Sequence, residues 1–421
     1  MKKTIVVCVL LILSMLSAGA GMAQESVELR FLCFQDGIEC DVYADLLARF
    51  SEDNPDISVL VEVLPEAEIH DRLAAEVEAG APPDFARVSD LDVLEGHYLN
   101  LYPLLTDPGY LYNSFPDIIF RSMSSYFQDI GLYGYPDAAK VVAPFVNLSR
   151  FEEAGVLVPG DGEDVASWDH WLAALDEVVM TTEAAYALSV DNKDHRLVGP
   201  AMSMGADYYD KGLSSADLDG LRDFLLILTE LMEDGKTPAD TLLGTGKSQE
   251  YFVRGETVMY ICGSWKAEEV AAQVGDAFEW AIVPNPSGAG GNTGVAQLTG
   301  LVAFADTEHP EAVGKVFDYL LEPKISTEFA VRSFTIPANE RLIFVDFIYD
   351  TEDPVVAAAL NAFAREVPRL QTQAIALDLH PLAPVYYEAS NTNLRAYFAG
   401  DLTLDEALAN LKARLHEAAG G

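Results

Sequence analysis

The chain has 421 residues, half of which are hydrophobic, and its formal net charge is −41. That amount of apolar sequence is enough for one or two large cores. The negative charge disfavours nucleic acid and anionic membrane surfaces as partners, because both repel a polyanion.

Residues 1–23 are predicted to be a cleaved secretory signal. Lys2 and Lys3 form a charged start, an unbroken apolar run follows over 5–13, and small residues then lead to Ala23. The apolar run is too short for a stable membrane anchor, and the small residues are typical of a cleavage site. We expect cleavage after Ala23, or alternatively after Ala20, and a soluble mature protein in the periplasm or outside the cell.

The mature sequence opens with a predicted strand, helix and strand. Apolar residues alternate over 27–34, recur at helical spacing from Val42 to Phe50, and alternate again over 57–63. A strand, a helix and a strand of these lengths form a βαβ unit, which favours a parallel sheet covered by helices. Further helical and strand-like segments continue to the end of the chain, so the predicted fold class is α/β.

Cys33 and Cys40 lie at the end of the first predicted strand and the start of the first helix. An exported chain meets an oxidising environment, so these two cysteines can form a local disulfide or remain as two thiols. Cys262 lies in an apolar run and is expected to be buried. The cysteine spacings make no convincing metal site. We also expect no cofactor.

Two later helices have recognisable starts. Ser167 is expected to cap a helix whose Trp168 and Trp171 face the core, and Thr403 with Glu406 forms a capping box. Trp280 lies in a predicted strand and is also assigned to the core.

Four stretches of the sequence carry a family resemblance. They are FSEDNPDI over 50–57, AGAPPD over 79–84, the segment from YGYP to FEEAG over 133–155, and the segment from FVRGETVM to GSW over 252–265. In this order and spacing the chain resembles the extracellular solute-binding proteins of ABC importers, specifically the large sugar-binding family that includes maltose-binding protein.

The resemblance implies a two-lobed periplasmic-binding-protein fold, in which each lobe is a mainly parallel sheet flanked by helices. We expect residues 24–141 plus 295–345 to form the first lobe and residues 145–292 plus 346–421 to form the second. The ligand would lie in a cleft between the lobes, beyond the carboxyl ends of their strands, and the lobes would close over it by a hinge motion. The implied partners are a small-molecule ligand and the permease subunits of an importer, and the protein itself is expected to be a monomer.

Loops that follow predicted strands supply the candidate ligand contacts. Trp265 is the leading candidate, because a Trp after Gly-Ser at a helix start can present its ring to a cleft, where apolar sugar faces stack. Gln35 and Asp36 can hydrogen-bond sugar hydroxyls, although a solvated turn is the alternative interpretation. Lys140 is either a contact or a surface lysine. The full set is Gln35, Asp36, Ser89, Asp90, Lys140, Tyr208, Trp265, Gln297, Thr299 and Arg332.

The function implied by the resemblance is capture of a sugar or oligosaccharide without a chemical step. A polyamine or a ferric ion is the alternative ligand, and paired tyrosines at 208–209 and 386–387 are the only indication of iron binding. A secreted carbohydrate-active enzyme is a further alternative. The chain has no H-E-x-x-H or G-x-S-x-G motif, and no carboxylate pair stands out, so we name no catalytic residue.

Overall fold

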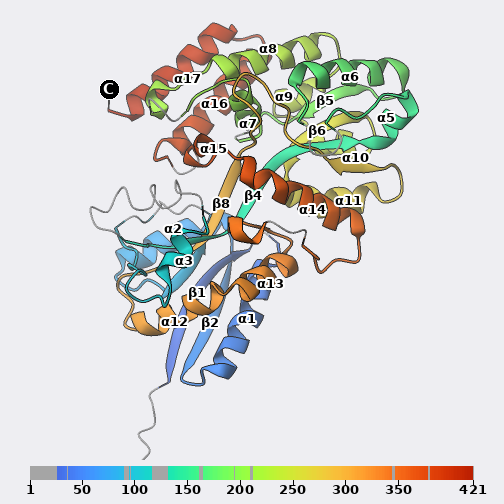
Figure 1. Ribbon diagram of the computed structural model, residues 1–421. Helices are drawn as coiled ribbons and strands as arrows, with labels where there is room; N and C mark the ends of the chain where they lie inside the picture. The colour runs from blue at the N-terminus through green and yellow to red at the C-terminus, as the bar shows by residue number, and fades with distance from the viewer. Residues whose placement is uncertain are drawn as a thin grey trace, which may run out of the picture.

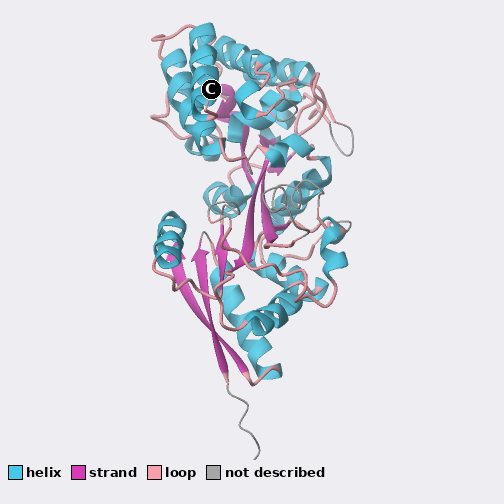
Figure 2. Cartoon of the chain, turned by 90° about the vertical axis from the view of Figure 1, so that its left-hand side faces the viewer, coloured by secondary structure: helices cyan, strands magenta, loops and turns pink. Residues whose placement is uncertain are grey.

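The structure is a computed structural model with two α/β lobes joined by long strands (Figures 1 and 2). It describes residues 26–35, 37–89, 94, 96–115, 131–160, 165–193, 195–208, 212–343, 347–377 and 380–420. The predicted signal at residues 1–23 lies outside this set, as do Asp36 and Asp90. The predicted α/β fold class is confirmed.

The first lobe is built on the predicted βαβ unit. Strands β1 (Val27–Gln35), β2 (Ile57–Pro65) and β3 (Phe85–Val88) are parallel, and β8 (Ala296–Ala303) pairs with β3 in the antiparallel direction. The helices of this lobe are α1 (Glu39–Asp53), α2 (Glu66–Glu78), α3 (Pro108–Tyr112), α12 (Pro310–Leu320) and α13 (Pro323–Ser333).

The second lobe has a smaller sheet and more helices. Strands β5 (Tyr186–Val190) and β6 (Thr257–Gly263) are parallel, and β7 (Trp280–Ile282) pairs with β4 (Tyr135–Asn147). The helices are α5 (Leu148–Ala154), α6 (Trp168–Thr181), α7 (His195–Ser203), α8 (Asp219–Glu233), α9 (Ala239–Leu242), α10 (Ser248–Val253), α11 (Ala267–Val274), α14 (Pro354–Glu366), α15 (Thr372–Ala376), α16 (Ala383–Phe398) and α17 (Leu404–Ala418).

Strand β4 belongs to both lobes. Its first part, from Tyr135 to Val141, pairs with β8, and its second part, from Val142, pairs with β6. The strands therefore form one sheet in the order β2-β1-β3-β8-β4-β6-β5, which runs through both lobes. Figure 1 shows β4 and β8 crossing the waist of the molecule side by side. The short β9 (Ile336–Pro337) also pairs with β4.

Two apolar cores fill the lobes. One runs from the first lobe to the face of the second-lobe strands that lies beneath α11 and α14, and the other fills the opposite face of those strands. The prediction that Trp168, Trp171 and Trp280 are core residues is confirmed, since all three are buried. Among the described residues, no helix is both long enough and apolar enough to cross a membrane.

The two predicted helix starts are also confirmed. The Ser167 side chain accepts a hydrogen bond from the His170 amide. At the start of α17, the Thr403 hydroxyl accepts from the Glu406 amide, and the Glu406 carboxylate accepts from the Thr403 amide in return. Each such contact satisfies an amide that the helix itself leaves without a partner.

The capping box gives a stability prediction. Thr403→Ala removes the capping hydroxyl and should lower the free energy of unfolding by about 1 kcal/mol, as measured by urea denaturation. Thr403→Ser keeps the hydroxyl and should retain most of the stability. Equal losses in both variants would show that the hydroxyl does not stabilise the helix.

Candidate functional site

A pocket of about 110 Å³ lies where the two crossing strands pass between the lobes. The first lobe supplies Gly37, Glu39, Arg87, Ser333, Phe334 and Thr335; the crossing strands supply Ala138, Ala139, Lys140 and Thr299; and Ser264, Trp265, Glu268 and Leu360 complete the lining. The pocket lies near the carboxyl ends of β1, β3 and β6, where open α/β sheets bind ligands.

Trp265 forms an aromatic wall of this pocket. It is partly buried and packs against both cores, and its ring contacts the His195 ring edge-on with centroids 5.3 Å apart. Gly263 makes this position possible, because a Cβ there would lie 1.8 Å from Cζ3 of Trp265. The next residue, Ser264, accepts a hydrogen bond from the Val141 amide at 3.3 Å and thereby ties the turn to β4.

A second aromatic residue, Phe334, reaches the pocket from the first lobe. It ends α13 with a left-handed backbone (φ 54°), and it is the only non-glycine among the described residues with a positive φ. That conformation costs free energy, and such residues cluster at functional sites. The pocket therefore has an aromatic side chain from each lobe.

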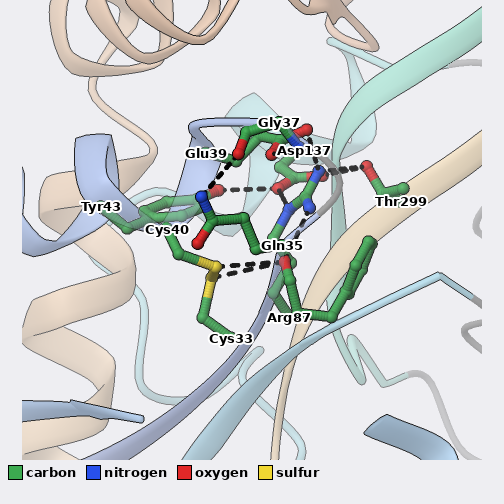
Figure 3. Close-up of a disulfide and its surroundings, with 10 residues drawn as sticks. Cys33, Gln35, Gly37, Glu39, Cys40, Tyr43, Arg87, Asp137 and Thr299 are labelled. Carbon is green, nitrogen blue, oxygen red and sulfur yellow. Dashed lines mark hydrogen bonds and ion pairs between the residues drawn. A yellow bond between two sulfur atoms is a disulfide. The ribbon is translucent and has the colours of Figure 1, made fainter. Parts of the chain in front are cut away.

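The floor of the pocket holds a buried positive charge, the guanidinium of Arg87 (Figure 3). Arg87 is 1% exposed. Its Nε donates to Asp137 at 2.7 Å, its Nη1 to the Phe34 carbonyl at 3.2 Å, and its Nη2 to the Thr299 hydroxyl at 3.1 Å. Its guanidinium also lies 4.3 Å from the Phe34 ring centroid, within the range of a cation–π contact. One side chain thus joins strands β1, β3, β4 and β8.

Asp137 is the main counter-charge in this network. Besides Arg87, it accepts from the Tyr43 hydroxyl at 2.8 Å and from the Thr299 hydroxyl at 2.6 Å. Burial opposes the charge on Arg87, but Asp137 and Glu39 more than offset this effect and raise the pKa of Arg87 above its usual range. Burial, followed by the charge of Asp137, raises the pKa of Tyr43 well above its usual range. Arg87 is therefore charged and Tyr43 neutral at any physiological pH.

The turn between β1 and α1 forms one side of the pocket, and a Cys33–Cys40 disulfide closes it (Figure 3). Both cysteines are fully buried. Between them, Gln35 donates to the Gly37 carbonyl at 2.6 Å, and the Gly37 amide donates to the Glu39 carboxylate at 2.7 Å.

Two further charged residues, Lys140 and Glu268, line the pocket. Lys140, with its side chain 15% exposed, forms an ion pair of 3.5 Å with Glu66 of α2. Glu268 lies in the first turn of α11, three residues after Trp265. Partial burial raises the pKa of its carboxyl group.

The structure brings three of the predicted contacts to the pocket: Lys140, Trp265 and Thr299. Gln35, Ser89 and Gln297 lie outside its lining, and Ser89 hydrogen-bonds His70 at 2.9 Å. Whether any of these residues binds a ligand is untested and stays a prediction.

Two predicted contacts lie away from the pocket. Tyr208 is 2% exposed and its hydroxyl accepts from that of Tyr386 at 3.0 Å, so it belongs to the second core. Arg332 is partly exposed on α13, where it forms ion pairs with Asp45 at 2.6 Å and with Glu328 at 3.1 Å. Its neighbours Ser333, Phe334 and Thr335 line the pocket in its place, because the helix ends there and the chain turns inward.

Four residues at or beside the pocket were not predicted from the sequence: Glu39, Arg87, Asp137 and Phe334. A charged residue inside a short apolar strand was an available signal for Arg87, since a buried charge needs a partner. Its partners come from segments far apart in the sequence, so neither Asp137 nor Glu39 could be assigned to it without the fold.

A larger hollow of about 920 Å³ lies elsewhere on the second lobe. It is bordered by α5, β7 and α14 and includes Phe151, Leu157, Ile282 and Arg369. It shares no residue with the pocket at the crossing strands and does not lie between the lobes. We therefore take the smaller pocket as the candidate ligand site.

Comparison with known proteins defines the class. Residues 45–344 match the family described as bacterial extracellular solute-binding protein, and the chain belongs to this family. A binding protein of Brucella abortus is 23% identical over 335 residues, covering 77% of this chain and 79% of its own length.

Solved structures agree with this assignment. The sugar-binding protein MalE of Xanthomonas citri superimposes with a TM-score of 0.74 at 19% identity, covering 93% of this chain and 97% of its own. The cyclic α-maltosyl-1,6-maltose binding protein of Arthrobacter globiformis has a TM-score of 0.74 at 18% identity, covering 93% and 98%. At these identities the likeness establishes the two-lobed fold, and the resemblance inferred from the sequence is confirmed.

The close approach of Gly263 and Trp265 gives a second prediction. Gly263→Ala should force the indole ring out of its place, because the backbone at φ −107° accepts alanine but the added Cβ meets the ring. Acrylamide quenching of tryptophan fluorescence should increase, since the other tryptophans, Trp168, Trp171 and Trp280, are buried. In a Trp265→Ala background the same glycine change should have no effect on quenching. An effect of equal size there would show that the signal does not come from Trp265.

Proposed function

We propose that this protein is the exported substrate-binding component of an ABC transporter, and that it captures a sugar or oligosaccharide between its lobes. The observation that carries this proposal is the pocket at the crossing strands, which combines aromatic side chains from both lobes with hydroxyl and charged groups. The ligand is released unaltered to the permease, so the protein is not an enzyme.

The lining of the pocket matches the chemistry of a sugar. The apolar faces of a pyranose pack on aromatic rings, and Trp265 and Phe334 offer such rings. Hydroxyl groups need both donors and acceptors, which Ser264, Lys140 and Glu268 supply. The structural relatives named above bind sugars according to their descriptions, which supports the same ligand class here.

Closure of the lobes would complete the site. We propose that the chain divides into residues 24–141 plus 295–345 and residues 145–292 plus 346–421. The change of partner within β4 between Val141 and Val142 supports a hinge at this point. Closure by such a hinge would bring further polar groups to the ligand. Gln35, Asp36, Ser89, Asp90 and Gln297 remain candidates for this role.

The proposed setting follows from the family and the first residues of the chain. A protein with a cleaved signal and a binding role would act in the periplasm or outside the cell, as a soluble monomer that meets permease subunits at the membrane. The net charge of −41 keeps such a protein away from anionic lipid surfaces.

Ligand binding tests the proposal. Wild-type protein should be stabilised in a thermal-shift screen by a member of a panel of maltose, maltotriose, maltotetraose and cyclic α-maltosyl-1,6-maltose. A ligand at a hundred times its Kd adds about 2.7 kcal/mol of stability. Stabilisation by spermidine or ferric ion alone would favour the alternative ligands, and turnover of an oligosaccharide by the purified protein would establish an enzyme.

Trp265 should supply a large part of the affinity for the sugar. Trp265→Ala is expected to weaken binding at least tenfold, or about 1.4 kcal/mol, in isothermal titration calorimetry. Tyr102→Ala removes an aromatic ring that is 41% exposed and outside the pocket, and it should leave the Kd unchanged. Unchanged affinity in Trp265→Ala, with a native circular dichroism spectrum, would remove this residue from the site.

A further inference from the structure

The turn between β1 and α1 brings a buried carboxylate, that of Glu39, to the pocket. Glu39 is the first residue of α1, is 5% exposed, and lines the pocket together with Gly37 and Arg87. A buried carboxylate is costly unless it is paired and hydrogen-bonded. The partners of its two oxygens therefore indicate what else the group can bind.

The two oxygens of Glu39 differ in their contacts. Oε2 accepts a hydrogen bond from the Gly37 amide at 2.7 Å. Oε1 lies 3.9 Å from Nη2 of Arg87, which is an ion pair but too long for a hydrogen bond. Within the described part of the chain, Oε1 accepts no hydrogen bond. It therefore retains the capacity to accept one from a group that enters the pocket.

The nearby guanidinium determines which group fits. Arg87 offsets one of the two carboxylate charges of Glu39 and Asp137, and Lys140 lines the same pocket, so an ammonium group entering here would meet two fixed positive charges. A carboxylate or phosphate would instead meet the acceptor oxygen of Glu39. A hydroxyl group is neutral and can donate to that oxygen without either penalty. The local chemistry thus favours a neutral hydroxyl over a polyamine or an anion.

The position of Glu39 depends on a turn that lacks a side-chain cap. The residue before α1, Ile38, makes no capping hydrogen bond. The disulfide joins Cys33 at the end of β1 to Cys40, the direct neighbour of Glu39. Gly37 leaves just enough room for the carboxylate, since a Cβ there would lie 3.3 Å from Oε2. The covalent link and the glycine together fix the position of the carboxylate that lines the pocket.

We propose that Glu39 accepts a hydrogen bond from a hydroxyl group of the bound sugar, with Arg87 as its positioning residue. The Cys33–Cys40 disulfide fixes the turn that carries this acceptor, so the affinity for sugar depends on the disulfide. This inference rests on the proposed function, which it deepens by assigning an anchoring group and a covalent constraint to the same pocket.

The first test compares two acidic residues of the same helix turn. Glu39→Gln keeps the size of the side chain and removes its charge, and Asp41→Asn does the same at an exposed position. With the sugar that stabilises wild type, calorimetry should show a Kd about tenfold or more higher for Glu39→Gln, because hydrogen bonds to charged groups are the stronger ones. Asp41→Asn should bind within about twofold of wild type.

The second test removes the covalent constraint. Cys33→Ser with Cys40→Ser should weaken sugar binding while the circular dichroism spectrum stays native, and adding Glu39→Gln to this pair should cost less than it does in wild type. Gly37→Ala keeps the disulfide but crowds the carboxylate, so it should weaken binding in the same direction even if the double serine variant fails to fold.

The outcomes separate this inference from the proposed function. Wild-type affinity in Glu39→Gln would overturn the anchoring role while the sugar-binding function stands. Wild-type affinity in a folded double serine variant would overturn the dependence on the disulfide. If no sugar of the panel binds the wild-type protein, the proposed function fails and this inference fails with it.

Discussion

Strand β4 is shared by the two lobes, and the position of the pocket depends on this sharing. Because β4 pairs with β8 before Val142 and with β6 after it, the backbone hydrogen bonds of the sheet continue across the waist. The carboxyl ends of the parallel strands in both lobes then face the same region. Aromatic and polar side chains at those ends become neighbours there, although they are far apart in sequence.

The buried charge of Arg87 reinforces the same region. A guanidinium in a sheet interior needs carboxylate and carbonyl partners, and the strands around it supply them through Asp137, Thr299 and Phe34. These contacts tie the first lobe to both crossing strands. The contacts of Arg87 therefore hold the pocket floor against the strands of the first lobe.

The sequence predicted the elements better than the site. Alternation and helical spacing gave the opening βαβ unit, and the capping residues Ser167 and Thr403 marked helix starts, because these signals are local. Trp265 was predicted to face a cleft because it follows a strand end in a recognisable motif, and it lines the pocket. Tyr208 lies outside the pocket lining, and its hydroxyl contacts Tyr386 in the core. The sequence around a tyrosine next to a loop does not distinguish these two settings.

The sequence by itself determined the α/β class and several helix starts, since each depends on neighbouring residues. It also determined the membership of a solute-binding family, through the order and spacing of four motifs. The tertiary structure alone decided which side chains meet at the pocket. Glu39, Arg87, Asp137 and Phe334 come from separate segments of the chain, and the pairing of a buried charge depends on distance in space. No local pattern contains that distance, because β3 and β4 are brought together by pairing with β8, which lies more than a hundred residues further along the chain.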